Sequence, residues 1–206
     1  AFSCYPGKNL GAAGQAGVIT TDDDTLAERC REIKEVGSKV KYVHNVKGGN
    51  YRIDPIQAIV LDEKLKYLDE WNANRRKFAE HYRYINNPEI IVPLVDPAPW
   101  CTEQVFHIFP ILVGDGEVDR QELMDYMQEQ GSQVGIHYPI CIEETGAYSE
   151  LGKKMHNPIT RTNADRLVSL PIHPFMSNDD TEKVVHILNQ WVSEKKVAQE
   201  AGAFRF

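Results

Sequence analysis

The sequence predicts an α/β fold, on three observations. Short apolar runs typical of strands alternate with segments whose apolar residues recur every three or four positions, as in amphipathic helices. Glycine or an acidic capping residue marks the ends of several of these helical segments. A chain of 206 residues is long enough to bury a core, as one domain or two small ones.

The first strand and helix are predicted within residues 16–37. Residues 16–21 form an apolar run that favours a strand, and three aspartates at 22–24 then supply a cap and negative charge at a helix start. We interpret this acidic triplet as capping and not as a metal site. The predicted helix ends at Gly37, and the loop 38–49 follows without periodicity. The residues that recur with helical period on one face of this predicted helix are Leu26, Ala27, Cys30, Ile33 and Lys34.

A second helix is predicted to begin at Asp54, with Pro55 in its first turn. Residues 72–84 are expected to continue helically. The proline-rich segment 86–100 follows, with 90–92 as a short extended piece. Residues of the second helix that are expected to face the core are Ile56, Ile59, Val60, Lys64, Leu65, Leu68 and Trp71.

The second half of the chain predicts a strand, a helix, a strand and a helix. The strand over 106–113 is buried despite Pro110, and the next helix starts near Asp119 and ends at Gly131. A further strand is expected over 134–138. The final helix covers 177–191, with Val184, Leu188, Trp191 and Val192 facing inward.

The charge and composition of the chain argue against several classes of function. The net charge of -7, with acidic and basic residues interspersed, argues against nucleic acid as a partner. No apolar run approaches the ~20 residues of a membrane helix, and no secretory signal opens the sequence. The four cysteines lie far apart, which favours reduced thiols in a cytoplasmic protein. The seven histidines show no spacing that indicates a zinc site.

The glycine-rich stretch 1–17 places a single lysine, Lys8, in a small-residue loop before the first strand. A loop that holds a lysine in one orientation suits covalent chemistry, because an amine becomes nucleophilic when its surroundings lower its pKa. Two other interpretations remain open from the residues alone. The loop could be an ordinary turn with a solvated lysine, or a phosphate loop, although Asn9 stands where that motif requires Ser or Thr.

Four blocks of sequence resemble the pyridoxal-phosphate sugar aminotransferases of the DegT/DnrJ/EryC1/StrS family. They read FSCYPGKNLG at 2–11, GSKVKYVH at 37–44 with GNYRID at 49–54, GIHYP at 135–139, and SLP at 169–171. The blocks follow the family order over nearly the whole chain. The resemblance implies the carboxyl-terminal part of a fold-type I aminotransferase: residues 1–53 as a remnant of the large cofactor domain, and 54–206 as a connecting helix and a small α/β domain.

The resemblance also implies the site. Lys8 would carry pyridoxal 5'-phosphate as a Schiff base and act as acid and base, while Ser3 and Asn50 would hold the cofactor phosphate. Asn50 would do so across the interface of a homodimer with shared active sites. His137, Tyr138 and Arg52 would border the substrate, with pairing to Asp54 as an alternative role for Arg52. The substrates would be an amino acid such as glutamate and a nucleotide-linked keto sugar, closest to a dTDP-3-keto-6-deoxyhexose.

Two departures from the family pattern qualify the resemblance. Gln15 and Ala16 stand where relatives show an aspartate and a glycine, and 143–145 reads EET where relatives show a further histidine. A truncated, inactive binding or regulatory partner is the alternative function, since the amino-terminal groups that clamp the ring would be missing. A related dehydratase is disfavoured, because such enzymes carry histidine in place of Lys8.

Overall fold

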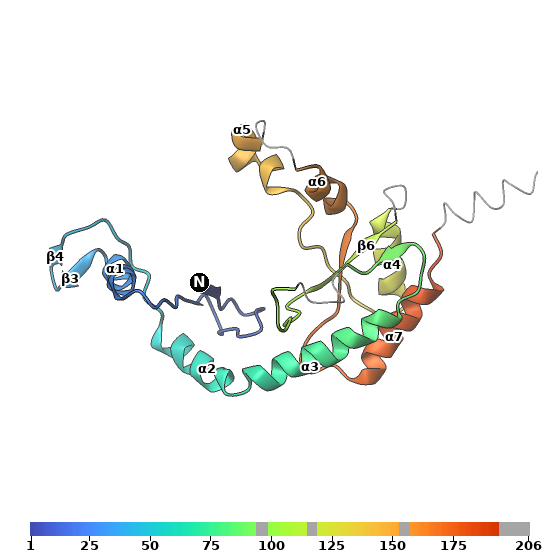
Figure 1. Cartoon of the computed structure of the whole chain (residues 1–206), viewed down its shortest axis with the longest axis horizontal. Coiled ribbons are helices and arrows are strands. Elements are labelled where there is room, and N and C mark those ends of the chain that lie inside the picture. The colour runs from blue at the N-terminus through green and yellow to red at the C-terminus, as the bar shows by residue number, and fades with distance from the viewer. Residues whose placement is uncertain (94–98, 115–118, 153–156, 194–206) are drawn as a thin grey trace, which may run out of the picture. The chain divides into compact units, whose positions relative to one another are not determined.

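The computed structural model describes residues 1–93, 99–114, 119–152 and 157–193. Two compact units divide the chain, residues 1–70 and 71–206, and each is described by itself. The predicted α/β class is confirmed, since both units combine helices with strands (Figure 1). The predicted domain boundary at 53/54, which refers to a longer family member, stays a prediction. Part of the proline-rich segment, residues 94–98, lies outside the described residues.

The first unit holds two small hairpins and two helices. Strand β1 pairs antiparallel with β2, in a register that sets Phe2 opposite Val18, so the predicted strand over 16–21 is real but only two residues long. The hairpin β3–β4 follows α1 directly and contacts it. The elements of this unit are β1 (Phe2–Ser3), β2 (Gly17–Val18), α1 (Asp24–Lys34), β3 (Ser38–Val40), β4 (Val43–His44) and α2 (Pro55–Leu65).

The helix α1 begins and ends as the sequence predicts. The Asp23 carboxylate accepts a hydrogen bond of 3.0 Å from the Leu26 amide, which confirms Asp23 as the capping residue, and Asp24 supplies negative charge in the first turn. Among the residues that the structure describes, no group of His, Cys, Asp and Glu is arranged to hold a metal ion. Gly37 has φ of 75°, and a Cβ there would lie 1.8 Å from the Val46 carbonyl oxygen, so only glycine fits this turn.

The prediction for the buried face of α2 was wrong for three of its residues, while Lys64, also on that face, is partly buried. Ile56 and Ile59 are 71% and 69% exposed, and Leu65 is exposed as well, whereas Leu61 is the residue of α2 that is buried. Helical periodicity identifies residues that share a face, but only a partner element can bury that face. The amino-terminal loop packs on the side of α2 that carries Leu61.

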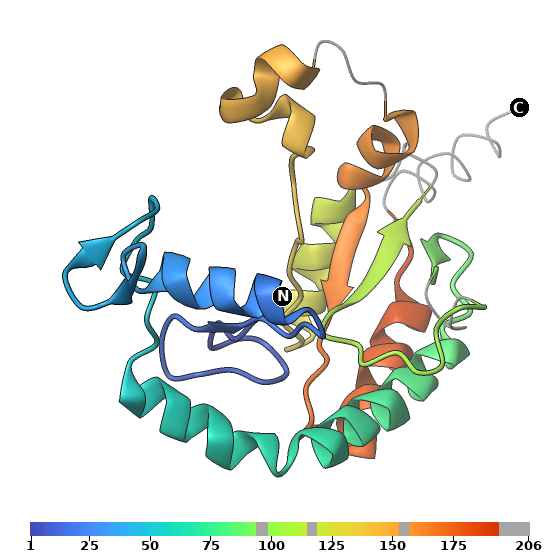
Figure 2. The same ribbon diagram turned by 60° about the vertical axis from the view of Figure 1, so that its left-hand side comes forward.

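The second unit is built on the antiparallel sheet β5-β6-β7, made of Ile90–Ile91, Phe109–Val113 and Leu167–Leu170. Figure 2 shows β6 and β7 side by side, as their pairing requires. The expectation of a strand over 134–138 was wrong, because that segment makes only an isolated bridge from Gly135 to Ser169. Strand β7, which pairs with β6, was not predicted from the sequence.

Helices cover this sheet and complete the core. The chain continues helically after α2, as predicted, through α3 (Leu68–His81) and a 3-10 turn (Tyr82–Tyr84). The Thr181 hydroxyl lies 2.9 Å from His81 Nδ1 and links α7 to α3. The further helices are α4 (Arg120–Glu129), η2 (Ile142–Glu144), η3 (Gly146–Tyr148), α5 (Ser149–Gly152), α6 (Pro158–Ala164) and α7 (Asn178–Gln190). The largest fully buried side chains of this core are Tyr82, Phe109, Ile111, Leu123, Met127 and Leu188.

The final helix, α7, follows the sequence prediction except at its last position. Val184, Leu188 and Trp191 are buried, but Val192 is 57% exposed because the helix has ended before it. Hydrogen bonds from the Ser177 amide and hydroxyl lower the pKa of the Asp180 carboxyl in a capping box. None of the helices in the described ranges is long and apolar enough to cross a membrane.

Candidate functional site

The loop that carries Lys8 is closed by backbone hydrogen bonds. The Cys4 amide donates to the Ala16 carbonyl and the Ala12 amide donates to the Cys4 carbonyl, both at 2.9 Å. Between them, the Lys8 amide donates to the Tyr5 carbonyl at 2.8 Å and forms a tight turn. Lys8 is half-buried. The loop therefore holds the lysine backbone in one conformation, unlike a freely solvated turn.

A close approach of two backbone segments makes Gly11 necessary in this loop. A Cβ at Gly11 would lie 2.4 Å from the Pro6 carbonyl oxygen, well inside van der Waals contact. Glycine at this position therefore lets the two backbone segments come together. By contrast, a Cβ at Gly7, directly before the lysine, would meet no atom within 4 Å.

Helix α2 anchors the lysine loop, a role that the sequence did not reveal. Lys64 Nζ donates to the Gly11 carbonyl oxygen at 2.8 Å, and Leu61 packs with Cys4 and Ala12 in a small core. The pattern of α2 had placed Lys64 on a core-facing stripe, but nothing in the sequence indicated a partner 53 residues away. The loop therefore packs against α2 and is hydrogen-bonded to it.

Replacing Lys64 with alanine should loosen this loop. The lost hydrogen bond involves a charged donor, which is worth about 1.5–3 kcal/mol, so exchange of the Cys4 and Ala12 amides should accelerate by roughly 10- to 100-fold. Hydrogen exchange measured by NMR tests this. The Lys66→Ala variant is the matched control, because the exposed Lys66 side chain forms a surface ion pair with Glu63 and makes no hydrogen bond with the loop among the described residues. Equal exchange rates in both variants would contradict the anchoring role.

Arg52 orients the side-chain amide of Asn50. Arg52 Nε donates to Asn50 Oδ1 at 2.9 Å, and its Nη1 lies 3.6 Å from a Glu35 carboxylate oxygen. The ion pair of Arg52 is thus with Glu35 and not with Asp54. The Lys34 ammonium, with a smaller contribution from Arg52, lowers the pKa of Glu35. Because the amide oxygen of Asn50 is engaged, its NH₂ group is the end directed to donate elsewhere.

The hairpin β3–β4 carries a cluster of cationic side chains. Lys41 Nζ lies 5.0 Å from the centre of the Tyr42 ring, and Tyr42 at the hairpin turn has φ of 70° and is 82% exposed. A cavity of about 380 Å³ opens beside the hairpin. It is lined by Glu35, Val36, Ser38, Lys39, Lys41, Tyr42, His44 and Arg52.

His137 and Tyr138 lie in the second unit, on the segment that bridges to β7. His137 Nδ1 is 2.9 Å from the Ser169 hydroxyl, and the His137 and Tyr138 rings meet edge to face at 5.7 Å. Tyr138 is 71% exposed and His137 is exposed too. Ser169 is buried, and its contact with His137 was not evident from the sequence.

Residues 143–145, which depart from the family pattern, contribute to local structure. Glu143 is buried and lies 3.8 Å from Arg161 Nε, which also pairs with Glu144 at 3.5 Å. Burial, with the nearby Glu144 and Glu143 carboxylates, raises the pKa of the Cys141 thiol. The two glutamates thus tie the 3-10 turn η2 to α6.

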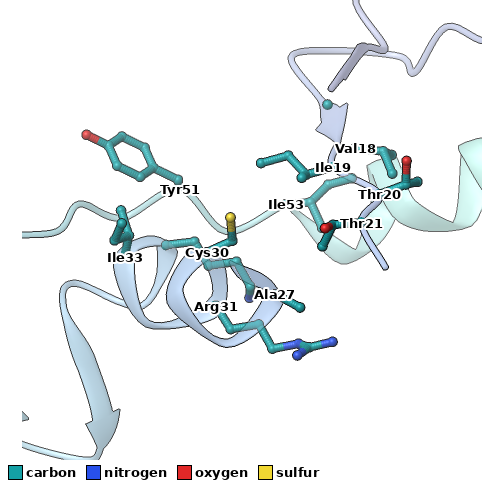
Figure 3. A pocket seen from close by; sticks show the side chains of 12 residues that line it. Val18, Ile19, Thr20, Thr21, Ala27, Cys30, Arg31, Ile33, Tyr51 and Ile53 are labelled. Carbon is teal, nitrogen blue, oxygen red and sulfur yellow. The ribbon is translucent and has the colours of Figure 1, made fainter. Parts of the chain in front are cut away.

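The first unit also contains a groove that the sequence did not predict. Its volume is about 870 Å³, and Figure 3 shows side chains from α1 and from the segments after β2 and after Asn50 around it. The helical face predicted for α1 forms one wall through Ala27, Cys30 and Ile33. That face lines an open groove and not a closed core. The facing wall includes Val18, Ile19, Tyr51 and Ile53.

The polar groups of the first unit fit a phosphorylated aldehyde. Lys8 supplies a primary amine, Ser3 a hydroxyl and Asn50 an amide NH₂ group. The Tyr5 amide donates to Ser3 Oγ at 3.5 Å, which leaves the hydroxyl hydrogen to be donated to a phosphate oxygen. Ser3 and Lys8 share one loop, Asn50 follows the β3–β4 hairpin, and His137 and Tyr138 belong to the other unit.

An α/β fold with a constrained lysine near hydroxyl and amide groups fits the class of pyridoxal-phosphate-dependent aminotransferases. Residues 1–189 match the model of the DegT/DnrJ/EryC1/StrS aminotransferase family, and the chain belongs to this family. The family resemblance of the four sequence blocks is therefore confirmed.

Individual relatives agree with this assignment. The chain is 39% identical over 189 residues to the erythromycin biosynthesis sensory transduction protein EryC1 of Saccharopolyspora erythraea, covering 91% of this chain and 50% of that protein. It is 42% identical over 207 residues to dTDP-3-amino-3,6-dideoxy-alpha-D-galactopyranose transaminase of Aneurinibacillus thermoaerophilus, covering 91% and 54%. The chain thus spans about half the length of these relatives.

A solved structure shows the same fold. The crystal structure of S. venezuelae DesV in complex with a ketimine intermediate superposes with a TM-score of 0.82 at 34% identity, covering 92% of this chain and 50% of that one. This agreement confirms the predicted fold-type I aminotransferase portion.

Proposed function

We propose that the protein to which this chain belongs transfers an amino group from an amino acid such as glutamate to a nucleotide-linked keto sugar. A dTDP-3-keto-6-deoxyhexose is the proposed sugar. The observation that carries the proposal is the constrained, half-buried Lys8 in a chain of this family. The dTDP-sugar transaminase of A. thermoaerophilus, at 42% identity, supports the sugar class.

Each proposed site residue acts on the cofactor, on the substrate or on a neighbouring site residue. Pyridoxal 5'-phosphate, when bound, supplies an electron sink that stabilises negative charge on the substrate carbon. Lys8 Nζ anchors the cofactor covalently and afterwards accepts and returns the proton of that carbon. Ser3 Oγ and Asn50 Nδ2 donate to the phosphate, and His137 and Tyr138 border the sugar. Arg52 keeps the Asn50 amide in a donating orientation and is also proposed to reach the substrate.

A homodimer with shared sites is part of this proposal. The cationic cavity beside the β3–β4 hairpin and the exposed Tyr42 suit a segment that reaches an anionic ligand at a neighbouring subunit. A cytoplasmic location is proposed as well, since all four cysteines are free.

The alternative is an inactive binding or regulatory partner. The name of the S. erythraea relative, a sensory transduction protein, favours it. The exposed apolar groove of the first unit also favours a binding role, because contiguous exposed apolar surface usually marks a site that another segment or protein covers. The presence of Lys8, the residue proposed to carry the chemistry, favours the aminotransferase function over the inactive partner.

An assay with glutamate and a panel of nucleotide keto sugars separates the two functions. The whole protein should convert glutamate to 2-oxoglutarate only when a 3-keto sugar nucleotide is present, and the 206-residue chain alone should bind the cofactor weakly. Absence of turnover with every sugar in the panel, despite cofactor binding, would favour the binding partner.

A further inference from the structure

The hydroxyl of Ser169 is fixed by the sheet of the second unit. Ser169 lies on β7 between the buried Val168 and Leu170 and is itself 6% exposed. Its amide donates to the Gly135 carbonyl at 2.7 Å, and the Gly135 amide donates back to the Ser169 carbonyl at 3.1 Å. These two bonds set the segment that carries His137 at the edge of β7. The position of the hydroxyl beside the imidazole is therefore determined by backbone pairing.

The contact between Ser169 and His137 selects one tautomer of the neutral imidazole. His137 Nδ1 lies 2.9 Å from Ser169 Oγ, and this is the only side-chain hydrogen bond of the Ser169 hydroxyl within the described ranges. If Nδ1 carried the proton, the hydroxyl hydrogen of the buried Ser169 would have no acceptor among the described residues, which is unfavourable. The favoured arrangement has Ser169 donating to Nδ1, so the ring proton resides on Nε2.

Steric contacts add to this restraint on the ring. A Cβ at Gly135 would lie 3.4 Å from His137 Cε1, so the glycine leaves the ring just enough room on that side. The Tyr138 ring packs edge to face against it at 5.7 Å. No hydrogen bond occupies Nε2 in the part of the chain that the structure describes, and the residue is exposed. Nε2–H is thus available to a ligand.

We propose that Ser169 is a positioning residue that keeps His137 as a hydrogen-bond donor, through Nε2–H, to a hydroxyl or carbonyl oxygen of the sugar substrate. The proposal rests on the proposed function, in which His137 borders the substrate. A donor of fixed direction would favour sugars with an oxygen at that position and disfavour those without one.

NMR of histidine-labelled 206-residue chain tests the tautomer without any substrate. At a pH where the ring is neutral, the native His137 should carry its proton on Nε2, and Ser169→Ala should show a mixture of both tautomers. Ser169→Thr keeps the hydroxyl and should retain the native pattern. A native His137 protonated on Nδ1 would overturn the proposal.

Kinetics of the whole protein test the consequence. Ser169→Ala should raise KM for the nucleotide keto sugar about 3- to 10-fold with kcat nearly unchanged, the effect of one hydrogen bond. In a His137→Ala background the same substitution should have no further effect. An equal effect in both backgrounds would assign Ser169 a merely structural role. The Nε2–H tautomer with unchanged KM would leave the positioning intact and refute the placement of His137 at the substrate.

Discussion

Replacing Lys8 with alanine is expected to abolish both covalent cofactor attachment and transamination. The amine of Lys8 is the group proposed to anchor the aldehyde and to move the substrate proton, and an alanine can do neither. Loss of a positioned acid and base alone costs about 10²–10⁴-fold in rate, and loss of the covalent anchor adds to it. The decrease in kcat should therefore be at least of this order.

The measurement separates attachment from turnover. After incubation of the whole protein with pyridoxal phosphate and reduction with borohydride, mass spectrometry should find the phosphopyridoxyl group on the peptide that contains Lys8. The Lys8→Ala protein should lack it, while Lys66→Ala, which removes an exposed lysine of the same unit, should retain it. A Lys8→Ala variant with full activity would exclude the proposed mechanism.

Replacing Arg75 with alanine is expected to cause the largest loss of stability among the polar substitutions considered. Arg75 is only 6% exposed, and its Nη1 donates to the carbonyl oxygens of Ile172 at 2.9 Å, Phe106 at 3.0 Å and His107 at 3.4 Å. Burial lowers the pKa of this guanidinium. Its removal leaves partly buried carbonyl groups without this donor, so the free energy of unfolding of the second unit should fall by about 3–5 kcal/mol.

The neighbouring arginine supplies the control for this experiment. Arg76 is one-third exposed and pairs with the exposed Glu103 at 3.2 Å, so Arg76→Ala should cost less than about 1 kcal/mol. Urea unfolding followed by tryptophan fluorescence reports on the second unit, because Trp71, Trp100 and Trp191 all lie in it. Similar midpoints for the two variants would show that Arg75 does not hold these segments together.

Local signals in the sequence predicted most helix limits correctly. Asp23 and Ser177 are capping residues whose effect depends on the nearest turn, so their positions could be read without knowledge of the fold. The proline within β6 is tolerated because β5 pairs only with Leu112 and Val113, which leaves that edge of β6 free at Pro110. The sequence suggested the strand there from its apolar density but could not supply this reason.

The errors concern partners that lie far along the chain. β7 was missed, and the segment 134–138 was assigned as a strand, because strand pairing is a property of two segments and not of one. The face of α2 was misjudged for the same reason. Apolar periodicity indicated Ile56 and Ile59, which are exposed, whereas the lysine loop contacts Leu61 and Lys64.

By itself the sequence determined the α/β class, the family and the lysine proposed to carry the chemistry, because these depend on composition, local pattern and motifs. Only the tertiary structure decided that Lys64 holds the lysine loop, that Arg52 directs the Asn50 amide and that Ser169 faces His137. Hydrogen-bond direction depends on atoms brought within about 3 Å of each other, and no spacing in the sequence encodes which distant residues will meet.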